Sequence, residues 1–256
     1  MPGAVAGNVA GSVGDSWSGA SYERIAETFA PIHDRVVQAL AIEPGERVLD
    51  VACGTGGVAL RAARAGADVV GIDLSADQLA KARQAADVEG LEVRFEEGDC
   101  QALPYADAAF DAVVCVFGAI FAPDHERTAG ELARVCRRDG RLALTAWPED
   151  EWSETHVRAG RPFVEDIDAR KWFEPTHVRG QLEDAFDLEF ETGTWRVEAG
   201  SAGELWELIS TSVPPLRAWL SSLDDAARDR AERVYLDFIA DGVVERRYRL
   251  VTGVRR

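Results

Sequence analysis

Hydrophobic and polar positions alternate along the chain up to Trp147 in a pattern typical of short buried strands separated by helices. Apolar residues three or four positions apart predict a helix from Tyr22 to Leu40. Further helices are predicted up to about Ala65, over Asp77–Ala86 and over Glu126–Cys136. Short apolar runs bounded by turn residues predict strands at Arg47–Ala52, Ala67–Ile72, Glu92–Glu96, Ala112–Phe117 and Arg141–Ala146. Strands that alternate with helices in this way indicate a parallel sheet with helices on both faces.

The pattern changes after Trp147. Pro148–Pro175 is rich in Trp, Asp and Glu and has no clear period. The later elements are predicted as a helix over Thr176–Phe186, a strand over Leu188–Val197, a helical stretch over Ser201–Ala240 that is interrupted at Pro214-Pro215, and a closing strand over Glu245–Val254. These segments are therefore interpreted as additions to the α/β core.

Composition limits the partners of this chain. It has 256 residues, with 46% hydrophobic and 29% charged residues, which is ordinary for a globular protein. Its formal net charge is -17, from 45 acidic and 28 basic residues. Such a chain repels phosphate backbones and anionic lipid surfaces, so no nucleic acid partner is expected. A small neutral or cationic ligand fits the charge better.

The cysteines and the apolar runs bear on location. Cys53, Cys100, Cys115 and Cys136 lie far apart without a C-x-x-C pair, so we expect no metal site and no disulfide framework. This usage favours a reducing compartment, and we expect a cytoplasmic protein. No apolar run reaches membrane-spanning length, so no membrane insertion is expected. Residues 1–16 lack the basic and apolar regions of a signal peptide and are interpreted as a flexible tail.

The segment from Val48 to Gly57 carries the first chemical signal. A predicted strand ends in a glycine turn, and a helix follows directly. Free N–H groups and the positive end of a helix at such a turn can hold a carboxylate or a phosphate. The turn is weak evidence by itself, because Gly54-x-Gly56-x-x-Ala59 also satisfies the dinucleotide-binding fingerprint.

Two aspartates after the following strands narrow the choice of ligand. Asp73 comes directly after the second predicted strand, where a carboxylate suits the two hydroxyls of a ribose. Asp99 follows the third strand, where it can accept a hydrogen bond from an exocyclic amine such as that of adenine. An aspartate at a strand end is often only a helix cap. Asp50, Asp73 and Asp99 at matching strand ends together favour a ligand site.

These motifs resemble the class I S-adenosylmethionine-dependent methyltransferases, and the ubiquinone/menaquinone C-methyltransferase-like (methyltransferase type 11) subgroup most of all. The resemblance is carried by Asp50-x-x-x-Gly54-x-Gly56, Asp73, Gly98-Asp99, Leu103–Asp111, Val116–Arg127 and Glu131–Val135. It implies a doubly wound, mostly parallel seven-stranded, Rossmann-like sheet with a helical cap. Residues 17–256 would form a single methyltransferase domain, with a cofactor-binding core at about 46–147 and cap elements at about 17–45, 148–175 and 199–244.

The resemblance also implies S-adenosyl-L-methionine as cofactor. Its expected contacts are Tyr22, Asp50, Ala52, Gly54, Gly56, Asp73, Leu74, Gln78, Asp99, Cys100 and Phe117. Asp50 and the turn at Gly54 would hold the methionine portion, and Phe117 would lie beside the sulfonium. Tyr22 would close over the cofactor from the N-terminal helix.

The nucleoside would lie on the next two strand ends. Asp73 would accept from both ribose hydroxyls, with Leu74 near the adenine. Asp99 would accept from the adenine amine, while the Cys100 N–H donates to a ring nitrogen. No catalytic residue is assigned, because no Asp/Glu–His pair in the sequence points to a base.

Three positions depart from the family pattern. Ala52 replaces the usual first glycine of the turn, and Gly57 stands where close relatives often carry Asn. Arg138-Asp139-Gly140 replaces the usual Pro-Gly-Gly before the fifth strand. The last change concerns folding more than binding.

The expected reaction is methyl transfer to a small, apolar or aromatic molecule by in-line displacement at the sulfonium methyl. A nicotinamide-dependent oxidoreductase would explain Gly54 and Asp73. It would not explain Asp50, because a carboxylate beside the pyrophosphate would repel it, and it would not explain Asp99. A non-catalytic methyltransferase-like binding protein is the other alternative. The oligomeric state and the methylated atom are left open.

Overall fold

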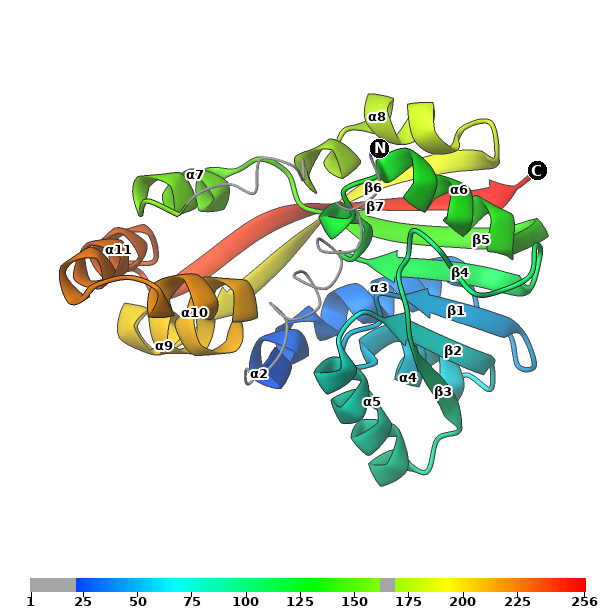
Figure 1. The fold of residues 1–256 in the computed structure, drawn as a ribbon, viewed down its shortest axis with the longest axis horizontal. Coiled ribbons are helices and arrows are strands. Elements are labelled where there is room, and N and C mark those ends of the chain that lie inside the picture. The colour runs from blue at the N-terminus through cyan, green and yellow to red at the C-terminus, as the bar shows by residue number, and fades with distance from the viewer. Residues whose placement is uncertain (1–21, 162–168) are drawn as a thin grey trace, which may run out of the picture.

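The computed structural model describes residues 22–161 and 169–256, so the tail predicted at 1–16 lies outside the described residues. The strands are β1 (Arg47–Val51), β2 (Asp68–Asp73), β3 (Val93–Glu97), β4 (Phe110–Val116), β5 (Cys136–Ala146), β6 (Phe186–Glu198) and β7 (Val243–Arg255). They form a seven-stranded sheet in the order β3-β2-β1-β4-β5-β7-β6 (Figure 1). Strands β1 to β5 pair in parallel, and β7 is antiparallel to both β5 and β6. The predicted mostly parallel seven-stranded sheet is confirmed.

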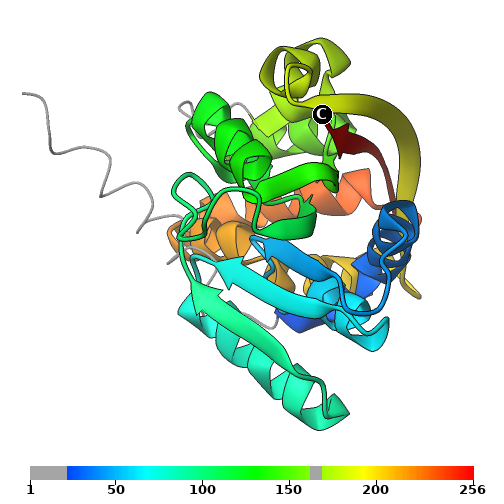
Figure 2. The same ribbon diagram turned by 90° about the vertical axis from the view of Figure 1, so that its right-hand side faces the viewer.

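Helices cover both faces of this sheet. They are α2 (Tyr22–Ala26), η1 (Glu27–Phe29), α3 (Ala30–Leu40), α4 (Gly57–Arg64), α5 (Ala76–Glu89), η2 (Ala119–Phe121), α6 (His125–Val135), α7 (Glu151–Arg158), η3 (Ala169–Phe173), α8 (Pro175–Leu182), α9 (Ala202–Ser212), α10 (Pro214–Ser221) and α11 (Asp225–Phe238). Helix α3 packs against α4, and α6 packs against α8. These pairs lie on opposite faces of the sheet (Figure 2). Of the helices that the structure describes, none is both long and apolar enough to cross a membrane.

Proline and capping residues mark changes within two predicted helical stretches. The stretch predicted from Tyr22 to Leu40 is helical throughout, but the 3-10 turn η1 lies between α2 and α3, and Pro31 lies in the first turn of α3. Proline disfavours regular α-helical bonding before it, because it lacks an N–H and its ring clashes with the carbonyl four residues back. The stretch predicted over 201–240 consists of three helices, since Asp224 caps α11 by accepting from the Ala227 N–H at 2.7 Å.

Strand β5 begins earlier than predicted. It follows α6 directly at Cys136, and its pairing with β4 shifts register between Phe110 and Ala112. Asp139 has a left-handed φ of 59° in this irregular stretch. The predicted turn at 138–140 is therefore an irregularity within the strand.

Strands β6 and β7 form a long antiparallel pair of strands, connected through α9, α10 and α11. Strand β7 pairs with β6 along its whole length, whereas β5 pairs with β7 only from Arg249 to Val254. The free half of the β6–β7 pair projects beyond the other strands toward α7, α9, α10 and α11 (Figure 1). Tyr235 of α11 stacks on Trp206 of α9, with ring centroids 4.9 Å apart, and contacts Trp152 of α7 at 5.7 Å. These aromatic rings pack the helices α7, α9 and α11 together and belong to the same continuous hydrophobic core as the sheet.

The connection between β3 and β4 contains no helix in residues 98–109, all of which the structure describes. Its backbone groups therefore need partners outside a helix. Helix α6 provides them: Glu131 accepts from the Leu103 N–H at 2.7 Å.

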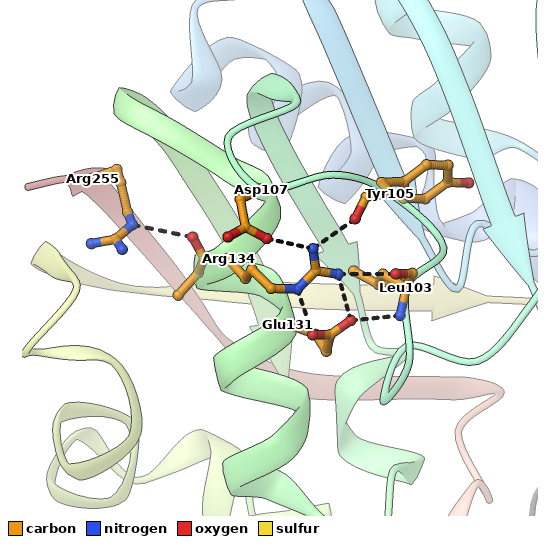
Figure 3. Close-up of polar contacts among 7 residues, drawn as sticks. Leu103, Tyr105, Asp107, Glu131, Arg134 and Arg255 are labelled. Carbon is orange, nitrogen blue, oxygen red and sulfur yellow. Dashed lines mark hydrogen bonds and ion pairs between the residues drawn. The ribbon is translucent and has the colours of Figure 1, made fainter.

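Arg134 is the centre of this network (Figure 3). Its guanidinium donates to the carbonyls of Leu103 (2.9 Å) and Tyr105 (2.6 Å) and pairs with Asp107 at 2.9 Å. Hydrogen bonds to Glu131 and Asp107 raise its pKa. Arg134 thus makes several of the contacts that hold the connection to α6, alongside Glu131.

Replacing Arg134 tests this role. Arg134→Ala leaves two carbonyls and two carboxylates without their donor, so we expect a loss of about 2–3 kcal/mol in the free energy of unfolding. Urea denaturation measures it. Arg138→Ala removes an exposed arginine nearby and should change stability by less than about 0.5 kcal/mol. Equal effects of the two substitutions would contradict the role of Arg134.

Candidate functional site

The carboxyl ends of the parallel strands bring most of the predicted cofactor residues to one edge of the sheet. Strand order reverses between β1 and β4, and α/β sheets bind ligands at such a reversal. Asp50 lies near the end of β1 and the glycine turn follows that strand. Asp73 ends β2, Asp99 follows β3 and Phe117 follows β4. The predicted positions are therefore neighbours in space.

The turn between β1 and α4 uses left-handed backbone conformations at Ala52 (φ 54°), Gly54 (φ 53°) and Gly56 (φ 84°). Glycine adopts these angles without strain. At Gly56 a Cβ would also lie 3.2 Å from the Phe95 ring and 3.3 Å from the Ala82 Cβ. The turn is therefore packed tightly onto β3 and α5, and α4 begins directly after it.

Ala52 is accommodated by a second glycine. A Cβ built on Gly118 would lie 2.2 Å from the Ala52 Cβ. The missing side chain of Gly118 thus leaves room for the methyl group that Ala52 introduces. Ala52, which departs from the family pattern, is thus accommodated by Gly118, which lies 66 residues further along the chain.

Asp73 ties the turn to β2. Its Oδ2 accepts from the Gly54 N–H at 2.8 Å, and its Oδ1 accepts from the Ser75 N–H at 2.8 Å. Burial raises the pKa of Asp73, while these backbone hydrogen bonds oppose the rise. A carboxylate has about four acceptor positions, so Asp73 retains capacity for further donors.

Asp50 lies beneath the turn with only 2% of its surface exposed. Its Oδ2 accepts from the Ala59 N–H at 2.9 Å, in the first turn of α4. Burial raises the pKa of Asp50 to about 7; the Ala59 hydrogen bond opposes this shift, and the charge of Asp73 adds to it. Asp50 therefore supports the start of α4 from within the protein.

Asp99 and Cys100 lie together after β3. Asp99 Oδ1 accepts from the Gln101 backbone N–H at 2.9 Å and from its side-chain amide at 3.2 Å. Gln101 in turn accepts from the Asp124 N–H at 3.1 Å. Burial, followed by the charge of Asp99, raises the pKa of the Cys100 thiol to about 12. Sequence reasoning missed Gln101, which orients Asp99 and has no motif of its own.

Tyr22, Leu74 and Gln78 border the same edge. A Cβ on Gly54 would lie 3.9 Å from Cε1 of Tyr22, and burial and the charge of Asp73 raise the pKa of Tyr22. Leu74 is half-buried after β2. Gln78 is buried in the first turn of α5, where its N–H donates to Ser75 Oγ at 3.4 Å.

Phe117 has a strained backbone and lies in an aromatic cluster. Its φ of 57° is rare for a bulky residue, and its N–H donates to Thr145 Oγ1 at 3.0 Å. Its ring stacks on Trp147 with centroids 4.0 Å apart. Phe29 lies 5.8 Å from Phe117 and 5.2 Å from Trp195. The sequence did not single out Phe29 or Thr145, because their contacts come from other elements of the chain.

A partly buried ion pair lies beside this cluster. The Arg246 guanidinium lies 4.4 Å from the Trp147 ring centroid and pairs with Asp150 at 2.8 Å. Burial lowers the pKa of Arg246, and Asp150 opposes that shift. The charges of Arg246 and Asp150 therefore cancel beside the Trp147 ring.

The fit between Ala52 and Gly118 leads to a double-mutant prediction. Gly118→Ala forces two methyl groups together, and overpacking of this kind costs about 1–3 kcal/mol. Adding Ala52→Gly removes one methyl group and should restore most of that loss. Thermal denaturation of the two single variants and the double variant measures the coupling. Strictly additive effects would contradict the proposed fit.

The raised pKa of Asp50 predicts a dependence of stability on pH. In the unfolded chain an aspartate titrates near 3.9, so between pH 4 and 7 only the unfolded state releases this proton. The contribution of Asp50 therefore falls as pH rises through this window, by at most about 1.4 kcal/mol per pH unit. Relative to the parent protein, Asp50→Asn should gain stability from pH 5 to pH 8. Urea denaturation measures this, with the exposed Asp229→Asn as control; parallel profiles for parent and Asp50→Asn would refute it.

Comparisons with known proteins agree with this arrangement. Residues 48–140 match the family model described as a methyltransferase domain. The chain is 32% identical over 254 residues to the Mycobacterium tuberculosis protein Rv1405c, over 94% of this chain and 93% of that protein. It is 47% identical over 112 residues to demethylmenaquinone methyltransferase of Thermus thermophilus, over 43% of this chain and 51% of that enzyme.

A solved structure shares the fold. Geranyl diphosphate methyltransferase in complex with S-adenosylmethionine has a TM-score of 0.57 at 20% identity, over 89% of this chain and 85% of that one. The strand order, the site at the carboxyl ends and the sequence relatives point the same way. The chain belongs to the class I S-adenosylmethionine-dependent methyltransferases, of the ubiquinone/menaquinone C-methyltransferase-like type.

Proposed function

We propose that the protein transfers the methyl group of S-adenosylmethionine to a small, planar, apolar or aromatic acceptor bound against Phe117 and Trp147. The observation that carries this proposal is the aromatic cluster after β4 and β5, directly beside the glycine turn. Aromatic faces bury flat apolar ligands and attract cations such as a sulfonium.

The donor set suits this cofactor. Asp50, Asp73 and Asp99 bring three carboxyl groups to one sheet edge, and S-adenosylmethionine offers an ammonium, a ribose diol and an adenine amine to them. A nicotinamide dinucleotide would bring its pyrophosphate to the glycine turn beside Asp50, where a carboxylate would repel it. In the proposed site, Asp73 accepts from the ribose, and Asp99 with the Cys100 N–H holds the adenine.

The protein's part in the reaction is placement and exclusion of water. The bound cofactor supplies an electrophilic methyl group on a sulfonium. A lone pair of the acceptor would form a bond to the methyl carbon while the bond between that carbon and sulfur breaks. The electron pair of the broken bond would stay on sulfur. Phe117 and Trp147 would hold the acceptor in line, which lowers the barrier by alignment. Charge is dispersed in this transition state when the acceptor is neutral, so a dry site helps more than a strong base.

The cap would determine which acceptor binds. We propose that the core at about 46–147 holds the cofactor, while the elements at about 17–45, 148–175 and 199–244 cover the acceptor; residues 17–21 and 162–168 of these ranges lie outside the described residues. The excess of acidic residues disfavours a nucleic acid acceptor. We further propose a cytoplasmic location, on the basis of four free cysteines in the described chain.

Calorimetric titration tests the cofactor part of this proposal. The protein should bind S-adenosylhomocysteine and not NAD. Asp73→Ala should raise the Kd by about 30–150-fold, because it loses a charge-assisted acceptor. Asp87→Ala, an exposed aspartate of α5, should leave the Kd unchanged.

Two results would contradict the site. One is NAD binding in place of S-adenosylhomocysteine, and the other is unchanged affinity in a folded Asp73→Ala protein. Incubation with S-adenosylmethionine and phenol, enol and amine acceptors, followed by mass spectrometry, tests turnover. Cofactor binding without any methylated product would favour a non-catalytic binding protein.

A further inference from the structure

Trp147 lies between an aromatic ring and a cation. Phe117 stacks on it with ring centroids 4.0 Å apart and ring planes 4° apart. The guanidinium carbon of Arg246 lies 4.4 Å from the Trp147 ring centroid. One face of an indole does not have room for two groups at these distances, so Phe117 and Arg246 lie on opposite faces of Trp147. Strand β7 thus places a positive charge on the far side of the aromatic pair.

This charge is unfavourable for a cationic ligand. The face of an aromatic ring attracts a cation through the negative charge of its π system. A second cation across the ring opposes that attraction, because like charges repel and a protein interior screens them poorly. Without a counter-ion, Arg246 would therefore disfavour a sulfonium beside Phe117 relative to a neutral sulfur.

Asp150 is the counter-ion. Its Oδ2 accepts from Arg246 Nε at 2.8 Å, and its Oδ1 accepts from Arg246 Nη2 at 3.2 Å. The side chains of Arg246 and Asp150 are 10% and 22% exposed. Asp150 also begins α7 by accepting from the Ser153 N–H at 3.2 Å. Within residues 22–161 and 169–256, Arg246 pairs with no other carboxylate.

The charge of Arg246 acts beyond its direct partner. His156 of α7 shows this effect: burial, followed by the charges of Arg161 and Arg246, lowers its pKa to about 2. Electrostatic effects have such a reach where little water separates the groups. The charge next to Trp147 therefore depends on whether Asp150 is ionised and in place.

We infer that the Arg246–Asp150 pair sets the relative affinity of the site for S-adenosylmethionine, which carries a sulfonium, and S-adenosylhomocysteine, which carries a neutral thioether. This inference rests on the proposed cofactor site. The two residues are positioning residues that act through Trp147, and no contact with the cofactor is assigned to them. An uncompensated Arg246 would favour the product of each turnover over the methyl donor.

Two charge variants of opposite sign test the inference. Asp150→Asn leaves Arg246 without a counter-ion, while asparagine still caps α7. The ratio of the calorimetric Kd values for the two ligands should shift by about 3–10-fold in favour of S-adenosylhomocysteine. Arg246→Met leaves the carboxylate alone and should shift the ratio in the opposite direction. A change in packing would weaken both ligands together.

A further variant and a further ligand separate charge from shape. Arg246→Lys keeps the charge and loses the planar guanidinium, so it should keep the ratio of the parent protein. Sinefungin carries an ammonium group where S-adenosylmethionine carries its sulfonium methyl. Its affinity should follow that of S-adenosylmethionine in both charge variants.

The matched controls lie on the same strand. Glu245→Gln and Arg247→Met make the same changes of charge at exposed neighbours of Arg246. Solvent and salt screen exposed charges, so the ratio should stay that of the parent protein in both controls.

Several outcomes would overturn the inference. They are a ratio that stays constant in both charge variants, a shift in the same direction in both, an equal shift in the controls, or a shift in Arg246→Lys that matches Arg246→Met. These results would leave the cofactor site itself intact. Failure of the parent protein to bind either ligand would instead overturn the cofactor site, and the role of the ion pair with it.

Discussion

The turn between β1 and α4 depends on two carboxyl groups that are largely withdrawn from water. Asp73 accepts from the Gly54 N–H, and Asp50 accepts from the Ala59 N–H. Burial of each carboxyl is unfavourable by itself, and the backbone donors partly offset it. In return the two aspartates fix where β1 ends and where α4 begins. The edge at which Asp99, Cys100 and the cap elements meet is built around that turn.

Two departures from the family pattern illustrate how tertiary contacts compensate local changes. Ala52 introduces a methyl group with a left-handed backbone, and Gly118 leaves room for it. Gly57 removes a side chain, and His33 occupies the vacated space. In both cases an extra group in one element faces a glycine in another. Close packing makes such pairs interdependent, since each position tolerates its residue only because of its partner.

In the proposed function, the core and the cap have separate tasks. The core positions strand ends whose chemistry suits a nucleoside and an amino acid, and its crossover to β4 is held by Arg134. The cap helices lie beside the projecting half of the β6–β7 strand pair and pack their aromatic rings around Tyr235. Phe117, Trp147 and Arg246 lie where the two meet. We therefore expect acceptor specificity to vary with the cap while the cofactor site is retained.

The sequence by itself predicted the parallel core, because the periodicity of hydrophobic residues and the turn residues between elements are local signals that do not depend on distant contacts. It also predicted the glycine turn and the aspartates at the strand ends, because each of them is recognised by its position directly at the end of a predicted strand. It missed the 3-10 turn before α3 and the early start of β5, since Pro31 and the irregularity at Asp139 act against otherwise continuous patterns.

Only the tertiary structure decided the contacts between distant segments. The Phe117–Trp147 stack joins the ends of two strands, and Phe29 reaches it from the N-terminal helix. The contact of His33 with Gly57 joins α3 to α4. Such pairs have no fixed spacing along the chain, because they depend on how whole helices pack on the sheet. Packing of this kind is a property of the folded molecule, and no local pattern in the sequence encodes it.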